Sequence, residues 1–302
     1  MQSTVSKTGK KPRLKVSRRN QTRRFTRSKI GNFFYVTFLL AFGAFSVLPL
    51  FYSIVTSLKP LDEIMAFPPR FFVTRPTIQN YLILPDLVSN LKIPLSRYVF
   101  NSVFVSVVYT VFYVFSSALA AFALCKSKAK YKNFIFLLVQ FALLFNSYTL
   151  SIPQYLIFSF LKIINTYWVM ILPSLASTMG VFLMKQYMEG SVPDALLEAA
   201  KIDGANIPYI FFRIVFPIIK PCWLTLMLFG FSAIWSAIPS GTIFSEQLKT
   251  LPTIMSQITS GGIARSGSAM AVTVIMMIPP IAMYFFSQSN VMEAMNSAGI
   301  KE

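Results

Sequence analysis

Long apolar segments separated by short polar ones dominate this chain. Six segments contain no Asp, Glu, Lys or Arg, and each is long enough for the roughly 20 apolar residues with which a helix crosses a bilayer. They are residues 30–58, 98–125, 133–161, 163–184, 221–245 and 266–292. Backbone amides inside hydrocarbon need partners within the segment, and the alternation typical of a β-barrel is absent. The pattern predicts an all-α polytopic membrane protein with six transmembrane helices.

A proline in the third segment makes its membrane helix shorter than the segment itself. Pro153 is expected to end the membrane helix near Leu150, because proline interrupts helical hydrogen bonding. Residues 155–167 would then form a short amphipathic segment on the far face. The chain is thus predicted to consist of a basic segment (1–30), a six-helix domain (31–292) with a polar loop at 188–221, and a tail (293–302).

Basic residues are distributed unequally between the two predicted sides. Of the 28 Lys and Arg residues, 20 lie in residues 1–30, in the loops 125–132 and 185–220, or in the tail, and eight lie on the other side. The positive-inside bias therefore places both termini and the 188–221 loop in the cytoplasm. We interpret the basic N-terminus as a retained signal anchor attracted to anionic lipid, and we expect no binding to nucleic acid.

Several kinds of chemistry lack the residues that they require. The chain has no histidine, no phosphate-binding G-x-x-x-x-G-K-[ST] string and no acid or base inside the six apolar segments. An ion-coupled carrier usually places ionisable groups within the membrane. Cys125 and Cys222 fall at predicted cytoplasmic helix ends and are expected to be free thiols. We therefore expect no catalytic residues, no metal and no cofactor in this chain, and a partner that supplies the energy.

The polar loop at 188–221 is predicted to form two short helices joined by a turn. Ser191, with Asp194 three residues later, resembles a capping-box start for the first helix. Gly204 suits a left-handed residue at its end. Asn206 is expected to cap the second helix, which should run to a break at Pro217. These residues alone leave a docking loop and a simple connector equally open.

Small and acidic residues distinguish the first of these two helices. Ala195, Ala199 and Ala200 are expected to keep one surface thin enough to enter a groove of a partner. Asp194 and Glu198 lie four residues apart, so their like charges slightly destabilise an isolated helix. That cost is easier to explain if Glu198 meets a cation on another protein.

The loop resembles the EAA loop of ABC importer permeases, in which this loop docks the membrane subunit onto a separate ATPase. Phe216 stands where that family usually has Leu. The residues to which the resemblance assigns coupling to the ATPase are Glu198, Ala199, Ala200, Asp203, Gly204, Ile214 and Pro217.

Residues 30–302 resemble the sugar-type permeases, in particular the maltose-type second permease. The matching pieces are 57–60, 80–81, 101–102, 152–153, 165–168, 182–186, Pro221, Trp235 and the Gly-containing tail. The resemblance implies a MetI-like helical core in a bacterial plasma membrane. It also implies three kinds of partner: a second homologous permease, two ATPase subunits that bind ATP and Mg, and an extracytoplasmic solute-binding protein.

This resemblance implies import of a carbohydrate, in particular an oligosaccharide. A permease for an amino acid or a polyamine, a secondary carrier and a membrane scaffold remain as alternatives. The candidate pathway residues are Trp235, Gln140 and Asn146. In the family this tryptophan is commonly followed by Asn, whereas here Ser236 follows Trp235. A role for Trp235 as an aromatic residue at the membrane interface is therefore equally open.

Overall fold

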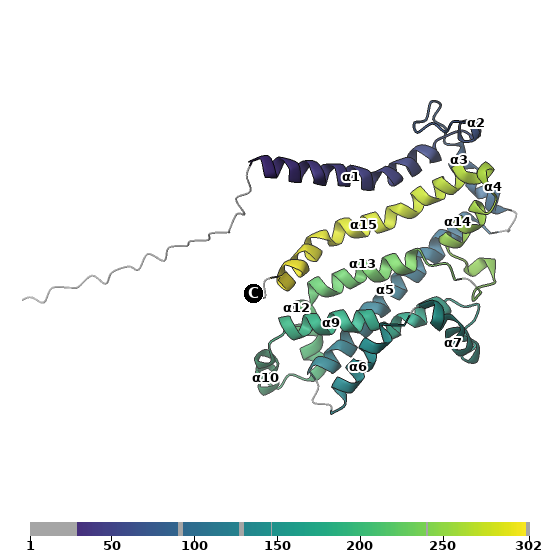
Figure 1. Cartoon of the computed structure of the whole chain (residues 1–302). Coiled ribbons are helices and arrows are strands. Elements are labelled where there is room, and N and C mark those ends of the chain that lie inside the picture. The colour runs from purple at the N-terminus through teal and green to yellow at the C-terminus, as the bar shows by residue number, and fades with distance from the viewer. Residues whose placement is uncertain (1–28, 90–92, 127–129, 146, 240, 300–302) are drawn as a thin grey trace, which may run out of the picture. The chain divides into compact units, whose positions relative to one another are not determined.

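The computed structural model describes residues 29–89, 93–126, 130–145, 147–239 and 241–299, and within these ranges the chain is helical without strands (Figure 1). The chain divides into two compact units, Met1–Pro49 and Leu50–Glu302. Helix α1 (Lys29–Ser57) begins in the first unit and ends in the second. All packing described below lies within the second unit.

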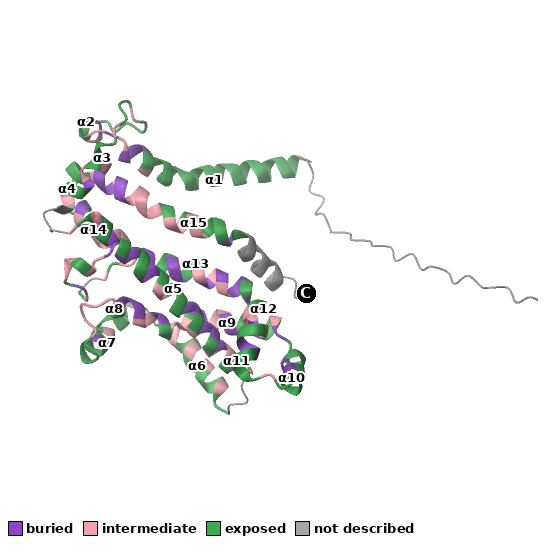
Figure 2. Cartoon of the chain, turned by 180° about the vertical axis from the view of Figure 1, so that it is seen from behind, coloured by how far each residue is buried: buried purple, intermediate pink, exposed green. Residues whose placement is uncertain are grey.

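Helix α5 (Leu95–Lys126) is the centre of the second unit. It packs against α9 (Thr178–Ser191) and α13 (Lys220–Trp235), and α13 in turn packs against α15 (Ser266–Gly299). Figure 2 shows buried residues concentrated on α5, α9 and α13. A Cβ atom added to Gly180 of α9 would lie 2.2 Å from Ser117 Oγ of α5. The small residue therefore permits the close approach of these two helices.

The remaining described elements are short helices and single helical turns. They are α2 (Leu61–Met65), α3 (Gln79–Leu82), α4 (Leu84–Ser89), α6 (Lys132–Ala142), α7 (Ser147–Phe160), α8 (Trp168–Ile171), η1 (Leu172–Ala176), α10 (Asp194–Ile202), α11 (Ile207–Tyr209), η2 (Ile210–Val215), α12 (Phe216–Ile218), η3 (Glu246–Leu248), α14 (Leu251–Thr259) and η4 (Ile263–Arg265).

Four described helices are long and apolar enough to cross a membrane, namely Ile30–Ser57, Leu95–Lys126, Trp168–Ser191 and Ile263–Gln288. A fifth candidate is the pair Ile207–Ile218 and Lys220–Trp235, which is bent by 80°. The all-helical membrane architecture is confirmed, whereas the count of six is not. Apolar side chains remain exposed along α6 and α7, as expected of surfaces in contact with lipid.

The third apolar segment differs from its prediction. Helix α6 ends at Ala142, where Leu144 and Phe145 donate to carbonyls three residues back, and α7 begins at Ser147. Pro153 lies inside α7, so the expected end of a helix near Leu150 was wrong. A proline removes only one helical hydrogen bond, and the surrounding turns of α7 accommodate that loss.

A buried asparagine joins the beginning of α5 to the segment between α13 and α14. Asn101 is fully buried, and its Nδ2 donates to the carbonyls of Gln247 and Lys249 at 2.8 Å each. Its Oδ1 accepts from the Tyr167 hydroxyl at 2.7 Å. The neighbouring Ser102 Oγ accepts from the first backbone amide of α14 at 2.7 Å. These bonds satisfy backbone groups that no regular helix pairs.

Two further asparagines hold non-helical backbone in the same way. Asn80 Nδ2 donates to the carbonyls of Ser57 and Lys59 at 2.8 Å each. Asn165 Oδ1 accepts from two consecutive amides, those of Phe244 and Ser245, at 3.0 and 2.9 Å. The positions that carry the sequence resemblance outside the loop are therefore, in part, structural hydrogen-bonding positions.

Candidate functional site

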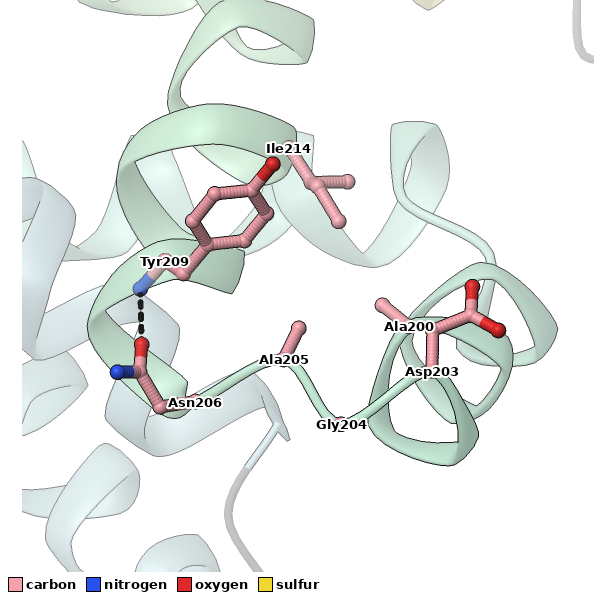
Figure 3. Close-up of a pocket in the computed structure, with 7 residues that line it drawn as sticks. All are labelled: Ala200, Asp203, Gly204, Ala205, Asn206, Tyr209 and Ile214. Atoms are coloured by element: carbon pink, nitrogen blue, oxygen red, sulfur yellow. Dashed lines mark hydrogen bonds between the residues drawn. The ribbon is translucent and has the colours of Figure 1, made fainter.

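The hairpin, residues 194–218, contains the predicted turn between two helices. Gly204 follows α10 with a φ of 80°, which is the left-handed conformation expected from its sequence. Asn206 then caps the second helix, with its Oδ1 accepting from the Tyr209 amide at 2.9 Å (Figure 3). Both predictions rest on local backbone chemistry, and both are confirmed.

The start of α10 differs from its prediction. Ser191 is the last residue of α9, and Pro193 is the N-cap of α10 without a side-chain hydrogen bond, so the capping box does not form. Asp194 instead pairs with Lys126 at the end of α5, at 2.7 Å between Oδ1 and Nζ. The hydrogen bond and the charge of Lys126 hold the pKa of the Asp194 carboxyl below its ordinary value. A tertiary ion pair has replaced the local cap.

Helix α10 has one buried and one exposed face. Leu197 and Ala200 are buried in a core cluster with residues of α5 and α9. The outward face of α10 consists of Ala195, Glu198, Ala199 and Ile202. Ile202 is 86% exposed and adds a large apolar side chain to this face. Ala200 therefore packs inward and does not belong to the thin outer surface for which it was predicted.

The second helix of the hairpin is continuous over residues 207–218 and contains a π-helical segment, η2. In this segment the Phe216 amide bonds to the Phe211 carbonyl, five residues back. Pro217 lies within the final turn, and the chain leaves the helix at Ile219, where ψ is 13°. The expected break at Pro217 was thus placed two residues early: Pro217 falls in the first turn of α12, directly after the π-helical segment, where a missing amide proton is tolerated.

An open pocket of 440 Å³ lies between α10 and the second helix (Figure 3). In this view the Asp203 carboxylate stands on one side, and the side chains of Tyr209 and Ile214 stand on the other. The lining residues are Ala200, Asp203, Gly204, Ala205, Asn206, Tyr209 and Ile214. The structure thus brings together four of the seven predicted coupling residues, Ala200, Asp203, Gly204 and Ile214.

The other three coupling residues lie outside the pocket. Glu198 and Ala199 are exposed on the outward face of α10, and Pro217 is exposed on α12. Four further residues of this site were not among those predicted for it, namely Ile202, Ala205, Asn206 and Tyr209. Ile202 could have been identified from its position, since it stands four residues after Glu198 and three after Ala199, on the same side of a helix.

Two carboxylates in or beside the pocket lack a partner within the described residues. Glu198 and Asp203 are exposed, and the side chain of neither forms a hydrogen bond or ion pair with another residue in the described part of the chain. Exposed carboxylates are ready to pair with cationic groups on another molecule. Together with Ala199 and Ile202, they give the hairpin an acidic surface with an apolar centre. This chemistry suits a protein partner that carries Lys or Arg beside an apolar groove.

The candidate pathway residues lie in different settings. Trp235 is buried, stacks on Phe231 and donates its Nε1–H to the carbonyl of Met276 at 2.9 Å. That carbonyl has no helical partner, because the residue four positions later, Pro280, lacks an amide proton. The indole therefore joins α13 to α15. Gln140 is exposed on α6, and Asn146 lies outside the described residues, so the pathway assignment stays a prediction.

Replacing Trp235 by Phe is expected to lower the stability of the folded chain by about 1–3 kcal/mol, because the Met276 carbonyl, to which Pro280 cannot donate, loses the indole N–H. Thermal unfolding in detergent measures this change. Trp168→Phe is the matched control, since Trp168 is exposed. Equal stability of the two variants would contradict the structural role of Trp235. A loss of transport without a loss of stability would favour a pathway role.

Comparison with solved structures identifies the fold. The chain is similar to a chain in the crystal structure of a bacterial ABC transporter involved in the import of the acidic polysaccharide alginate, with a TM-score of 0.69 and 19% identity. The similarity covers 87% of this chain and 98% of the other. At this identity the likeness shows a shared fold, the importer-permease arrangement of helices.

Two curated relatives extend over nearly the full chain. The polygalacturonan/rhamnogalacturonan transport system permease protein YtcP of Bacillus subtilis is 28% identical over 84% of this chain and 92% of its own length. The arabinooligosaccharides transport system permease protein AraQ of Halalkalibacterium halodurans is 27% identical over 88% of this chain and 95% of its own length. Residues 95–296, which include the hairpin and most of the described helices, match the family described as binding-protein-dependent transport system inner membrane component. Since this match covers most of the chain, the protein belongs to that family of transport permeases.

Proposed function

We propose that this chain is the permease subunit of an ATP-driven importer for a carbohydrate of the oligosaccharide class. Its partners are a second homologous permease, two ATPase subunits that bind ATP and Mg, and an extracytoplasmic solute-binding protein. The observation that supports the proposal most strongly is the outward face of α10. There Glu198, which has no side-chain partner among the described residues, stands between Ala195 and Ile202 beside an open pocket. The hairpin has the exposure and chemistry of a docking surface.

In this proposal the hairpin transmits movement and performs no chemistry. Leu197 and Ala200 fix α10 to the cluster that also contains Ala118 and Ala121 of α5. A helix packed in this way moves with its neighbours as a rigid body when the ATPase dimer closes. The movement of α10 would thereby carry α5 and α9 with it and expose the solute path to one side of the membrane at a time.

The substrate class follows from the relatives and from the charge of the apolar segments. YtcP and AraQ are named for the transport of oligomeric or polymeric saccharides. The six apolar segments contain no acid or base, so a polyamine would find no counter-charge in them. A neutral saccharide avoids that cost. By the same reasoning, we expect the part of the solute that touches this subunit to be uncharged.

The proposed orientation places both termini and the hairpin in the cytoplasm. Lys126, Lys201 and Arg213 lie on the hairpin side, and the positive-inside bias assigns the eleven cations of residues 1–30 to the cytoplasm as well. The hairpin would therefore face the ATPase, whereas the segment held by Asn101 and Asn165 would face the solute-binding protein.

The experiment that tests the function uses the assembled transporter in proteoliposomes. We expect the tagged chain to purify with an ATPase and a second permease, and to import arabino-oligosaccharides only when ATP and the binding protein are present. Uptake should persist when an uncoupler removes the proton gradient at constant ATP. Uptake by the chain without an ATPase, or immediate loss of uptake with the uncoupler, would favour a secondary carrier.

A further inference from the structure

Lys126 occupies a junction that the docking function does not yet explain. It is the last residue of α5, and its side chain is only 9% exposed. Its Nζ donates to the Val192 carbonyl at 2.8 Å and to Asp194 Oδ1 at 2.7 Å. Val192 is the C-cap of α9, and Asp194 is the first residue of α10. One ammonium group therefore holds three helix ends together.

The connection between α9 and α10 makes this junction important for movement. Only Val192 and Pro193 separate the two helices, and both have extended backbone angles. The linker could act as a hinge about which α10 turns. Lys126 restrains that hinge. A rotation of α10 must either break the bonds of Lys126 to Val192 and Asp194 or pull the end of α5 along. An ion pair that is shielded from water on the lysine side resists such separation better than a fully exposed one.

Helix α5 extends from this junction to the opposite end of the second unit. Its 32 residues correspond to a length of about 48 Å at 1.5 Å per residue. Near its first turn, Asn101 and Ser102 hold the backbone around η3 and the start of α14. A single helix is thus tied to the hairpin at one end and to the loop between α13 and α14 at the other.

We propose that Lys126 is a positioning residue that links the docking helix α10 mechanically to α5, so that a movement at either end of α5 reaches the other. This proposal rests on the proposed function, because it gives the route by which a signal from the solute-binding protein reaches the ATPase. Lys126 touches neither solute nor nucleotide. It acts by keeping α10 and α5 in a fixed relation.

A lysine that transmits movement and a lysine that only stabilises the hairpin predict different effects when Lys126 is replaced. If Lys126 merely shaped the hairpin, its loss would weaken the association with the ATPase. If it transmits movement, the ATPase should still bind, because Leu197 and Ala200 keep α10 against the core cluster, while the direct bond between the start of α10 and the end of α5 is lost. The loss should appear only in the response of ATP hydrolysis to the binding protein.

The test compares ATP hydrolysis by the assembled transporter with and without the solute-binding protein that purifies with it, saturated with arabino-oligosaccharides. Lys126→Met should retain the ATPase and the basal rate but lose stimulation by the binding protein. Lys126→Arg, which keeps the charge and the donors, should retain stimulation. The Lys126→Glu, Asp194→Lys double variant should recover part of it, because the ion pair is restored while the bond to the Val192 carbonyl is not. Lys201→Met is the matched control on the exposed side of α10.

The possible failures can be told apart. A wild-type transporter without a co-purifying ATPase or without stimulation overturns the proposed function, and this proposal with it. A wild-type response in Lys126→Met overturns the mechanical link alone. Equal loss of the ATPase and of stimulation in Lys126→Met also overturns it, because the lysine would then only shape the docking surface. Asp194→Asn keeps an oxygen acceptor for the ammonium group, so it should lose stimulation only in part. This variant disturbs folding little and therefore checks the result obtained with Lys126→Met.

Discussion

Transport is expected to fail in a Glu198→Lys variant that still folds and inserts into the membrane. The Glu198 side chain is exposed and has no partner within the described residues, so its replacement breaks no hydrogen bond or ion pair among them. Under the proposed docking, its carboxylate meets a cation of the ATPase in a charge-assisted contact of about 1.5–3 kcal/mol. Loss of that contact weakens association about 10- to 100-fold, and a positive charge adds repulsion.

The measurement is the amount of ATPase that purifies with the tagged chain, alongside uptake by the same membranes. Lys220→Glu is a suitable control, because it reverses an exposed charge on the same side of the protein but outside α10. Glu189 would be a poor control, since it pairs with the nearly buried Lys185 at 2.6 Å. Normal ATPase recovery and normal uptake in Glu198→Lys would reduce the hairpin to a connector.

Gly204 allows a second test of the same surface. A Cβ atom at this position would meet nothing within 4 Å inside the chain, and only the positive φ disfavours a side chain. Asn tolerates this backbone conformation better than other residues with side chains. Gly204→Asn should therefore preserve folding but place an amide in the pocket that the ATPase would occupy. Retained transport in this variant would show that the pocket stays empty in the working complex.

The sequence predicted the parts of the hairpin that depend on local chemistry. The positive φ of Gly204 and the cap at Asn206 follow from what these residues do within three or four positions of the chain. The start of α10 could not be predicted in that way. Its Asp194 pairs with Lys126, 68 residues away, and this tertiary contact removes the need for a capping box.

The number of spans shows a different limit of sequence analysis. Absence of charge marks a segment that can enter a membrane, but it does not show where a helix stops. The third segment is interrupted between Ala142 and Ser147, and the helix before α13 bends by 80° near Ile219. Neither break coincides with the prolines expected to cause it, Pro153 and Pro217. Both depend on packing that hydropathy does not record.

Trp235 illustrates why the solute path was harder to predict than the docking surface. A tryptophan near a helix end can contact a saccharide, lie at a membrane interface or pack in a core, and the sequence does not distinguish these roles. Only the structure reveals the Met276 carbonyl that Pro280 leaves without a donor. Docking residues, in contrast, lie close together in one hairpin, where helical periodicity places them.

The largest loss of stability is expected for Asn101→Leu, which keeps the approximate size of the side chain but removes its three hydrogen bonds. The carbonyls of Gln247 and Lys249 and the hydroxyl of Tyr167 would all lose a partner. The Gln247 carbonyl keeps a bond from Arg97 Nε at 3.3 Å, so two groups, the Lys249 carbonyl and the Tyr167 O–H, are left without their partner. An unsatisfied buried polar group costs about 1–3 kcal/mol, so we expect a total of about 2–6 kcal/mol. Since native proteins are stable by about 5–15 kcal/mol, much of the protein should fail to accumulate.

Thermal unfolding of the detergent-solubilised chain and its yield in membranes measure this effect. Gln140→Leu is the matched control, because it makes the same kind of amide-to-leucine replacement at an exposed position of α6. Asn101→Asp should also destabilise, since a carboxylate cannot donate to the two carbonyls and would lie beside their negative ends. If Asn101→Leu unfolds at the same temperature as Gln140→Leu, the bonds of Asn101 contribute little. The loop between α13 and α14 would then be held by its other bonds, which involve Arg97, Tyr98, Ser102 and Asn165, and by apolar packing.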